Sequence, residues 1–196
     1  LNTLSSLISS LTNPTNITNS IKSIKKEKLS SNTVSDYIEH CLDTFLISEA
    51  KRYDVKGKHY FEYPNKYYFV DIGLRNARLN FRQFDPGHIM ENIVYNELIS
   101  RGYSVDIGVV VDRRNNANCQ KEIDFVVNLG DKKMYIQSAW QMNTDKKINA
   151  ELDSLKLTKD FFTKIIIQND IPATFTDEDG IIHCNLIEFL LNPDLL

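Results

Sequence analysis

The sequence has 196 residues, 42% of them hydrophobic and 25% charged, which is enough apolar material for one large or two small globular domains. No apolar run approaches the roughly 20 residues that a membrane-spanning helix needs, so no membrane partner is expected. The cysteines Cys41, Cys119 and Cys184 are far apart and odd in number, which argues against a disulfide framework or a zinc cluster. Reduced thiols are typical of the cytoplasm, which is the expected location.

Charge divides the chain into two parts. Residues 1–84 hold 12 Lys and Arg against 8 Asp and Glu, a net of +4, whereas residues 85–196 hold 11 against 18, a net of −7. This asymmetry indicates two regions with different partners, and we take 1–84 and 85–196 as two predicted domains. The chain starts at Leu1 without an initiator Met or a signal-peptide pattern, so we expect a fragment of a longer protein.

Three short helices followed by a hairpin are predicted in the first domain. Leucines and isoleucines at helical spacing mark one helix within 1–12 and a second from Ile17. Ser30 to Thr33 is typical of a turn and N-cap before a third helix over 34–42. A hairpin turn is predicted at Lys56-Gly57-Lys58. This order of elements is typical of a winged helix-turn-helix, which often binds DNA through its third helix and its wing.

The positive charge of this domain lies on the second helix and the hairpin. The third helix carries Asp36, Glu39 and Asp43 and no Lys or Arg, so it is poorly suited to reading base edges. The lysines would contact phosphates instead, and duplex DNA is expected to bind through residues 20–60. The alternative is a solvated lysine face on a module that only packs against a neighbouring domain. The candidate nucleic-acid-binding residues are Lys22, Lys25, Lys26, Lys28, Lys56 and Lys58.

The second domain has an α/β layer pattern. Apolar periodicity and turn residues predict, in order, a helix over 88–100, strands over 105–111, 122–128 and 134–139, a helix through Ile148 and Leu155, a strand over 161–168, a short strand over 181–184 and a closing helix over 186–191.

The predicted hairpin over 122–139 carries the candidate chemistry. Gly130-Asp131 suits a two-residue loop, which places Asp124 directly opposite Gln137. The strand period then puts Glu122 and Ala139 on the same face as this pair. A carboxylate beside a second oxygen ligand is suited to Mg²⁺, so Asp124 and Gln137 are candidate metal ligands, and a structural hydrogen bond between them is the alternative. The residues expected on the opposite, core-facing side are Ile123, Phe125, Val127, Met134 and Ile136.

The chain resembles a known group of proteins along essentially its whole length. Glu91 on a helix, Asp124 at the start of one strand and Gln137-x-Ala139 on the next are similar to the PD-(D/E)XK nuclease core, whose last motif ends in Lys. The resemblance is closer still to the C-terminal region of prokaryotic AAA-superfamily ATPases. It implies an α/β fold with a winged-helix-like module followed by a restriction-endonuclease-like mixed-sheet domain, after an N-terminal nucleotide-binding domain. The segments that carry it are residues 67–74, 91–103, 121–127 and 135–139.

Two departures from the family pattern shape the functional expectation. The sequence has no Gly-x-x-x-x-Gly-Lys-Ser/Thr motif, so ATP is expected on the domain that the resemblance places upstream, and no cofactor is expected in this fragment. Ala139 stands at the lysine position, and alanine can neither orient a water molecule nor offset negative charge. Glu91, Asp124 and Gln137 are therefore predicted to form a degenerate catalytic site.

Three functions follow from these observations. The first is a non-catalytic nucleic-acid-binding or regulatory region whose partner is the ATPase domain of the same protein. The second is an active Mg²⁺-dependent nuclease in which another lysine has taken over. The third is a protein-interaction module that makes a homo-oligomer. The lysines considered for the second function are Lys132, Lys133, Lys146 and Lys147.

Some polar residues have a structural explanation as well. Glu91 lies at the edge of an apolar helical stripe and is either a site residue or one half of an ion pair. Glu97 lies within that stripe, where an ion pair with Arg101 four residues later is the better account. The four histidines have no partners at metal-ligand spacing and are expected to be structural or exposed to solvent.

Overall fold

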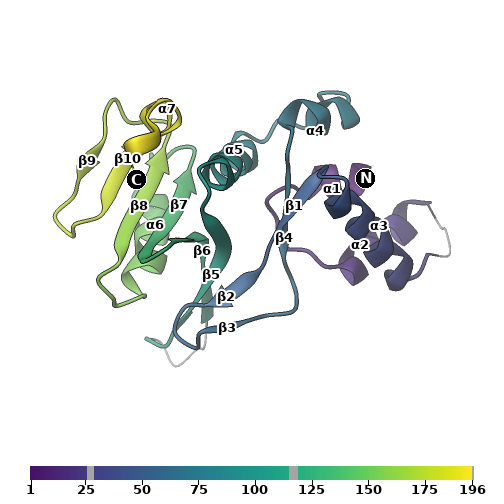
Figure 1. The fold of residues 1–196 in the computed structure, drawn as a ribbon, viewed down its shortest axis with the longest axis horizontal. Coiled ribbons are helices and arrows are strands. Elements are labelled where there is room, and N and C mark those ends of the chain that lie inside the picture. The colour runs from purple at the N-terminus through teal and green to yellow at the C-terminus, as the bar shows by residue number, and fades with distance from the viewer. Residues whose placement is uncertain (26–28, 115–118, 196) are drawn as a thin grey trace.

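The described part of the chain, residues 1–25, 29–114 and 119–195 of a computed structural model, folds around two β-sheets (Figure 1). A two-stranded sheet with the first three helices forms one end of the molecule, and an eight-stranded sheet forms the other. The helices are α1 (Asn2–Ser6), α2 (Pro14–Lys25), α3 (Ser31–Asp43), α4 (Ile72–Arg78), α5 (Pro86–Ser100), α6 (Asp145–Lys156), α7 (Leu186–Leu191) and the 3-10 helix η1 (Pro193–Leu195). The strands are β1 (Ile47–Ala50), β2 (Arg52–Asp54), β3 (His59–Tyr60), β4 (Lys66–Phe69), β5 (Ser104–Asp112), β6 (Cys119–Leu129), β7 (Lys132–Ala139), β8 (Thr163–Gln168), β9 (Phe175–Thr176) and β10 (Ile182–Asn185).

The eight-stranded sheet is mixed, with the order β3-β2-β5-β6-β7-β8-β10-β9. Strands β5, β6 and β7 pair antiparallel, whereas β8 joins β7 in parallel and β10 joins β8 in parallel. Ile165, Ile166 and Ile167 of β8 are all buried, as expected for a strand whose two faces are both covered. The predicted order of helix, three strands, helix and strand in the second domain is confirmed by α5, β5–β7, α6 and β8.

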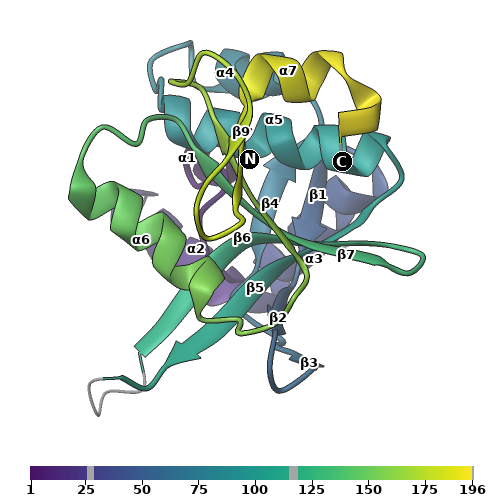
Figure 2. The same ribbon diagram turned by 90° about the vertical axis from the view of Figure 1, so that its left-hand side faces the viewer.

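Two apolar cores lie on the two faces of this sheet. One core joins the sheet to α5 and α7, through residues such as Val94, Leu98 and Phe189. The other joins the sheet to α6, through residues such as Leu155 and Tyr135. Figure 2 shows α5 and α7 lying together and α6 set apart from them. A third core holds α1–α3 against the small sheet of β1 and β4.

The predicted hairpin at Lys56-Gly57-Lys58 is present, but it belongs to the large sheet. Strand β2 pairs with β3 across this turn, and β2 also runs parallel to β5, with Arg52 opposite Ile107. The strands packed beside the three N-terminal helices are instead β1 and β4. The domain boundary at residue 84 stays a prediction. Strands β2 and β3, which precede this boundary in the sequence, are part of the eight-stranded sheet that the second half of the chain forms.

A β-bulge in β6 breaks the alternation of its side chains. Asp106 lies opposite Val126 but Gly108 lies opposite Ile123, so two residues of β6 face a single residue of β5. Ile123 and Val126 both join the α6-side core, while Phe125 joins the α5-side core. The prediction that Ile123 and Phe125 share a face was therefore wrong, because strict alternation does not hold across a bulge.

The N-termini of α3 and α5 each carry a capping side chain. Ser30 accepts a hydrogen bond from the Thr33 backbone N–H, which confirms the predicted N-cap of α3. Asp85 and Pro86 begin α5 in the same way, with an N-cap carboxylate and a proline at the first position. Helix α4 was not predicted, because its sequence has no clear apolar stripe. No helix in the described ranges is long and apolar enough to cross a membrane.

Gly108→Ala tests the close packing beside the bulge. A Cβ atom at this position would lie 2.8 Å from Val126 Cγ2 and 2.9 Å from Ile123 Cβ. Overpacking of this kind should lower the free energy of unfolding in urea by about 1–3 kcal/mol. The control is Gly87→Ala in α5, where the nearest atom lies 3.5 Å away and stability should be unchanged or slightly higher. Equal stability of the two variants would contradict the packing described here.

Candidate functional site

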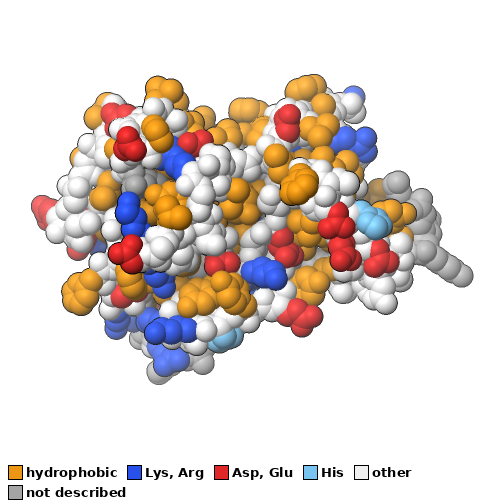
Figure 3. Space-filling model, in the orientation of Figure 1, with side chains coloured by type: hydrophobic (Ala, Val, Ile, Leu, Met, Phe, Trp, Pro, Cys, Tyr) orange, Lys and Arg blue, Asp and Glu red, His pale blue; other side chains and the backbone are white. Residues whose placement is uncertain are grey.

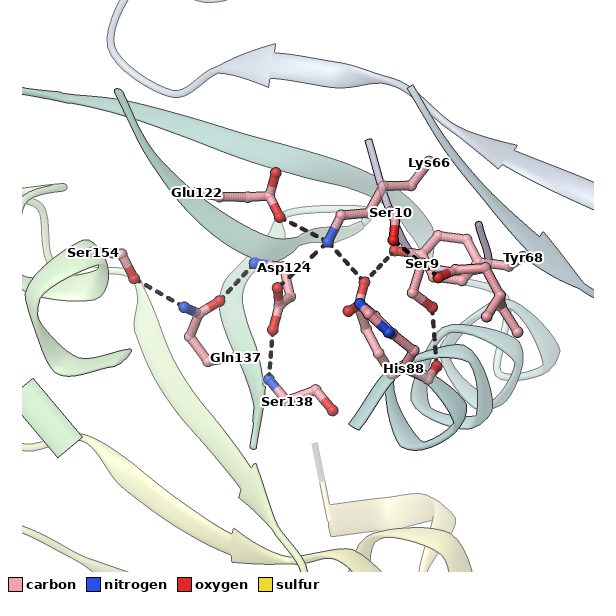
Figure 4. Close-up of polar contacts among 12 residues, drawn as sticks. Ser9, Ser10, Lys66, Tyr68, His88, Glu122, Asp124, Gln137, Ser138 and Ser154 are labelled. Atoms are coloured by element: carbon pink, nitrogen blue, oxygen red, sulfur yellow. Dashed lines mark hydrogen bonds and ion pairs between the residues drawn. The ribbon is translucent and has the colours of Figure 1, made fainter. Parts of the chain in front are cut away.

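A buried lysine lies at the centre of a group of carboxylates (Figure 4). Lys66 Nζ lies 2.8 Å from Glu91 Oε1, 2.7 Å from Glu122 Oε1 and 3.7 Å from Asp124 Oδ1. The hydroxyl of Tyr68 donates a second hydrogen bond to Glu91 Oε1, at 2.8 Å. The Lys66 side chain is only 5% exposed. We call these five residues the lysine–carboxylate cluster.

Strand β4 brings Lys66 and Tyr68 to this position. All four residues of β4 are buried, and its backbone is fixed to α5 by Asn92. The Asn92 side chain accepts from the Phe69 N–H at 2.7 Å and donates to the Phe69 carbonyl at 2.8 Å. The Tyr68 ring also stacks on Tyr95 of α5, with centroids 4.0 Å apart. These contacts leave the Lys66 side chain little freedom to move away from the carboxylates.

The carboxylates come from α5 and β6. Glu91 projects from the first half of α5, on the side that faces the sheet. Asp124 lies in the β-bulge, and its Oδ2 accepts a hydrogen bond from the Ser138 N–H at 2.9 Å. Glu122 and Asp124 both reach Lys66 while Ile123 between them joins the α6-side core, so these two carboxylates share a face of β6, as predicted. Glu122 is the most exposed of the three carboxylates, at 33%.

Gln137 does not meet the Asp124 carboxylate. Its Oε1 accepts from the Asp124 backbone N–H at 2.6 Å, and its Nε2 donates to Glu151 Oε2 and Ser154 Oγ, at 2.8 and 3.0 Å. The last two partners belong to α6, so Gln137 extends toward the α6 side of the sheet. The prediction that the two side chains share a face was wrong, although the hairpin register from Phe125 opposite Ile136 to Leu129 opposite Lys132 is the one predicted.

The cluster is poorly suited to a divalent cation. Glu91 Oε1 already accepts two hydrogen bonds, Asp124 Oδ2 is bound to a backbone N–H, and the Gln137 oxygen is engaged elsewhere. Mg²⁺ needs several oxygen ligands in near-octahedral geometry, whereas here the ammonium of Lys66 holds the central position. Within the described residues, no group of three or more His, Cys, Asp and Glu side chains is arranged to hold a metal ion. The structure thus does not bring Asp124 and Gln137 together as ligands.

Lys66 is the site residue that sequence reasoning missed. Ala139, at the lysine position of the nuclease motif, packs in the α6-side core as expected for an alanine. Four other lysines were considered as replacements for the missing one, but the lysine beside Asp124 is Lys66, from a strand far away in the sequence. The available signal was a lysine directly before the aromatic strand Tyr67-Tyr68-Phe69, where a buried charge requires a partner.

None of the other lysines considered is seen to reach Asp124. Lys133 lies over the rings of Tyr53, Tyr135 and Phe162. Lys132 is exposed at the β6–β7 turn, and the side chains of Lys146 and Lys147 lie outside the described residues.

Burial governs the protonation of the cluster. It raises the pKa of Glu91 to about 8, even though Lys66 acts in the opposite direction. Burial, with repulsion from Glu122, also raises the pKa of Asp124. For Lys66 burial alone would lower the pKa, but attraction to the three carboxylates outweighs it and raises the pKa above its ordinary value. Attraction to the carboxylates thus keeps the amine charged at neutral pH, while burial makes the Glu91 carboxyl easier to protonate than an exposed one.

The three predicted DNA-binding lysines whose side chains the structure describes lie in two separate places. Lys22 is exposed on α2, whereas Lys56 and Lys58 are exposed on the β2–β3 turn. Figure 1 draws these two places well apart along the long axis of the molecule. Lys26 and Lys28, with the side chain of Lys25, lie outside the described residues.

Other predicted contacts are as expected. Arg101 Nε donates to Glu97 Oε1 at 2.8 Å, which confirms that ion pair. His183 has structural partners on both ring nitrogens, Gln168 Oε1 at 2.6 Å and Asp177 Oδ2 at 3.1 Å.

Comparison with known families gives the relationship of the chain. Residues 86–186 match the family described as Domain of unknown function (DUF4143). The chain belongs to the DUF4143 family. Residues 1–85 match a second family, described as Domain of unknown function (DUF8612), so Lys66 lies in one matched region and its three carboxylate partners lie in the other.

Two curated relatives of this DUF4143 chain are uncharacterized proteins. One, from Haemophilus influenzae, is 35% identical over 162 residues, which are 83% of this chain and 38% of the relative. The other, from Methanocaldococcus jannaschii, is 30% identical over 148 residues, which are 73% of this chain and 32% of the relative. The chain thus spans about a third of the length of the curated relatives it matches. No solved structure matches.

Lys66→Met tests how much the fold depends on the cluster. Removing the ammonium leaves buried carboxylates without a cation, which should lower the free energy of unfolding by about 3–5 kcal/mol. Lys22→Met, at an exposed position on α2, should change it by less than about 0.5 kcal/mol. Urea unfolding measures both, and a Lys66→Met variant as stable as Lys22→Met would contradict the arrangement.

The raised pKa of Glu91 makes a prediction about pH. Its pKa rises from 4.5 to about 8 on folding, so the folded state binds this proton more tightly than the unfolded state does. The associated stability is fully present below about pH 4.5 and is lost as the pH rises through about 8. Between pH 5 and pH 8.5, the free energy of unfolding in urea should fall more for wild type than for Glu91→Gln, whose side chain cannot titrate. A loss of equal size in both would exclude Glu91 as its source.

Proposed function

We propose that this DUF4143 chain is a non-catalytic, nuclease-like C-terminal region of a longer ATPase-family protein, with a nucleic-acid-binding or regulatory role. The observation that carries the proposal is the position of Lys66 Nζ, within 2.8 Å of Glu91 and Glu122. A nuclease of this class needs its carboxylates free for Mg²⁺, and here an ammonium group of the protein itself already occupies the position between them.

The order of elements supports a nuclease-like core. Helix α5, the antiparallel strands β5–β7, then α6 and the parallel strand β8 follow the order of a restriction-endonuclease-like domain. Glu91 on the first helix and Asp124 on the second strand of this core occupy the positions that the family motif gives to acidic residues. The three N-terminal helices with β1 and β4 are proposed to be the winged-helix-like module.

The length of the relatives supports the ATPase proposal. Both curated relatives extend well beyond the matched region, which is 38% of one and 32% of the other. We propose that the remaining length includes the nucleotide-binding domain, which would be the partner of this region and the place where ATP binds.

An active nuclease is the second candidate function, and one observation favours it. Lys66 Nζ lies 3.7 Å from Asp124 Oδ1, so Lys66 could supply the amine that Ala139 cannot. In that case the carboxylates would have to exchange the ammonium for a metal ion during the reaction.

A plasmid-nicking assay distinguishes the two candidates. With Mg²⁺ or Mn²⁺ present, we expect wild type and Asp124→Asn to leave supercoiled plasmid equally intact. Nicking by wild type that requires the metal and disappears in Asp124→Asn would overturn the non-catalytic proposal.

A thermal-shift experiment in the same buffers adds a positive test. Lys66→Met should gain melting temperature on addition of Mn²⁺, because its three carboxylates then lack a cation and a divalent ion binds only the folded state. Wild type should show no such gain, and Lys22→Met serves as the control for the loss of one lysine. A shift in wild type as large as in Lys66→Met would show that Lys66 does not exclude the metal ion.

A further inference from the structure

Three separate segments form a basic groove at one end of the large sheet. The β2–β3 turn contributes Lys56, the end of β5 contributes Arg113, and the segment after α6 contributes Lys159. The groove has a volume of about 630 Å³. Figure 3 shows Lys and Arg side chains gathered at the lower left of the molecule, where the β2–β3 hairpin and the ends of the long strands lie in Figure 1. We call this feature the basic groove; Lys58, two residues after Lys56 in the same turn, is exposed but does not line it, and we consider its charge together with those of the groove.

The four cations are not neutralised by the protein. Lys56, Lys58, Arg113 and Lys159 are all exposed, and no carboxylate of a described residue forms a salt bridge with any of them. Their neighbour Arg114 differs, since it pairs with Asp112 and Asp153 and is therefore not counted here.

The carboxylate in the wall of the groove is already engaged. Asp54 Oδ1 accepts hydrogen bonds from the backbone N–H groups of Lys56 and Gly57, at 2.9 and 2.7 Å. Within a region whose net charge is −7 over residues 85–196, Arg113 and Lys159 are thus part of a local concentration of positive charge.

Two of the four cations have a backbone conformation that favours glycine. The φ angles of Lys58 and Lys159 are +54° and +56°, in the left-handed region. A side chain there costs conformational energy that glycine avoids, so a lysine at both positions suggests a role for the charge itself.

The geometry points to the phosphate backbone of a nucleic acid as the ligand of the basic groove. Sites for small molecules fix their ligand with a few well-placed polar groups in a largely enclosed pocket. Here the cations are long, exposed side chains from three segments, which suits the non-specific contacts that Lys and Arg make with successive phosphates. The inference deepens the nucleic-acid-binding role proposed above and rests on that role, but not on the absence of cleavage.

The basic groove is distinct from the lysine–carboxylate cluster. Leu157 in its wall belongs to the α6-side core, whereas Glu91 projects from α5 on the other face of the sheet. It also differs from the predicted DNA surface over residues 20–60, since it keeps Lys56 and Lys58 but adds Arg113 and Lys159 from the second half of the chain.

The test measures binding of a fluorescein-labelled DNA duplex by fluorescence anisotropy over a series of salt concentrations. If the four cations each contact one phosphate, the logarithm of the association constant should fall linearly with the logarithm of the salt concentration, with a slope of about −3 to −4. The variant Lys58→Gly/Lys159→Gly should reduce the magnitude of this slope by about two. Because glycine accepts both φ angles, this variant should melt at the same temperature as wild type or higher, so lost binding cannot be ascribed to unfolding.

Two controls accompany this variant. Arg82→Ala/Lys132→Ala removes the same charge from exposed positions that do not line the basic groove and should leave the slope unchanged. Asn80→Gly makes a similar backbone change at φ +52° without a change of charge and should also leave it unchanged.

The outcomes separate this inference from the proposed function. DNA binding that is lost in the groove variant but retained in both controls supports the basic groove. Binding that the groove variant retains but that is weakened in a separate Lys22→Ala variant, on the predicted α2 surface, overturns the groove but keeps a nucleic-acid-binding role. Binding that inorganic phosphate displaces completely at constant ionic strength overturns nucleic acid as the ligand. No binding at low salt overturns both the groove and that role, while the nicking assay still decides on catalysis.

Discussion

The attraction between the Lys66 ammonium and three carboxylates is the constraint on which the rest of the site depends. Removing four charged groups from water is costly, and their mutual attraction compensates only if the geometry is good and the remaining hydrogen bonds are made. The surrounding structure meets this condition in specific ways. Asn92 fixes the strand that carries Lys66, Tyr68 donates to Glu91, and the Ser138 N–H donates to Asp124. The same contacts keep the oxygens from serving as ligands of a metal ion.

The β-bulge changes which residues of β6 share a face of the sheet. Glu122 and Asp124 both meet Lys66 while Ile123 joins the α6-side core, so side chains alternate regularly up to Asp124. The extra residue lets Phe125 join the α5-side core as well, and alternation resumes with Val126 on the α6 side. Gln137 stays on the α6 side and closes the gap where the two strands separate, because its side chain accepts from the Asp124 N–H in place of a backbone carbonyl. The lysine–carboxylate cluster thus connects helix α5 to strands β4 and β6.

The sequence predicted elements far better than it predicted the site. Local signals were sufficient for the cap at Ser30, the loop at Gly130 and the buried strand around Ile166, because each of these depends on neighbours within a few residues. The bulge could not be predicted, since it depends on how β6 meets β5 across the sheet. Lys66 could not be paired with its carboxylates for a similar reason. The partners lie 25 to 58 residues away, and only the docking of β4 on α5 brings them together.

The sharing of the cluster between the two matched families has a consequence for how such proteins can diversify. A gene fusion that joined the first 85 residues of one relative to the second half of another would have to preserve charge balance across the junction. A first half without a lysine at position 66 would leave the carboxylates buried without a cation. A second half without those carboxylates would leave the Lys66 ammonium buried without a partner. The two halves are therefore expected to be inherited as a matched pair, even though each is recognisable as a family of its own.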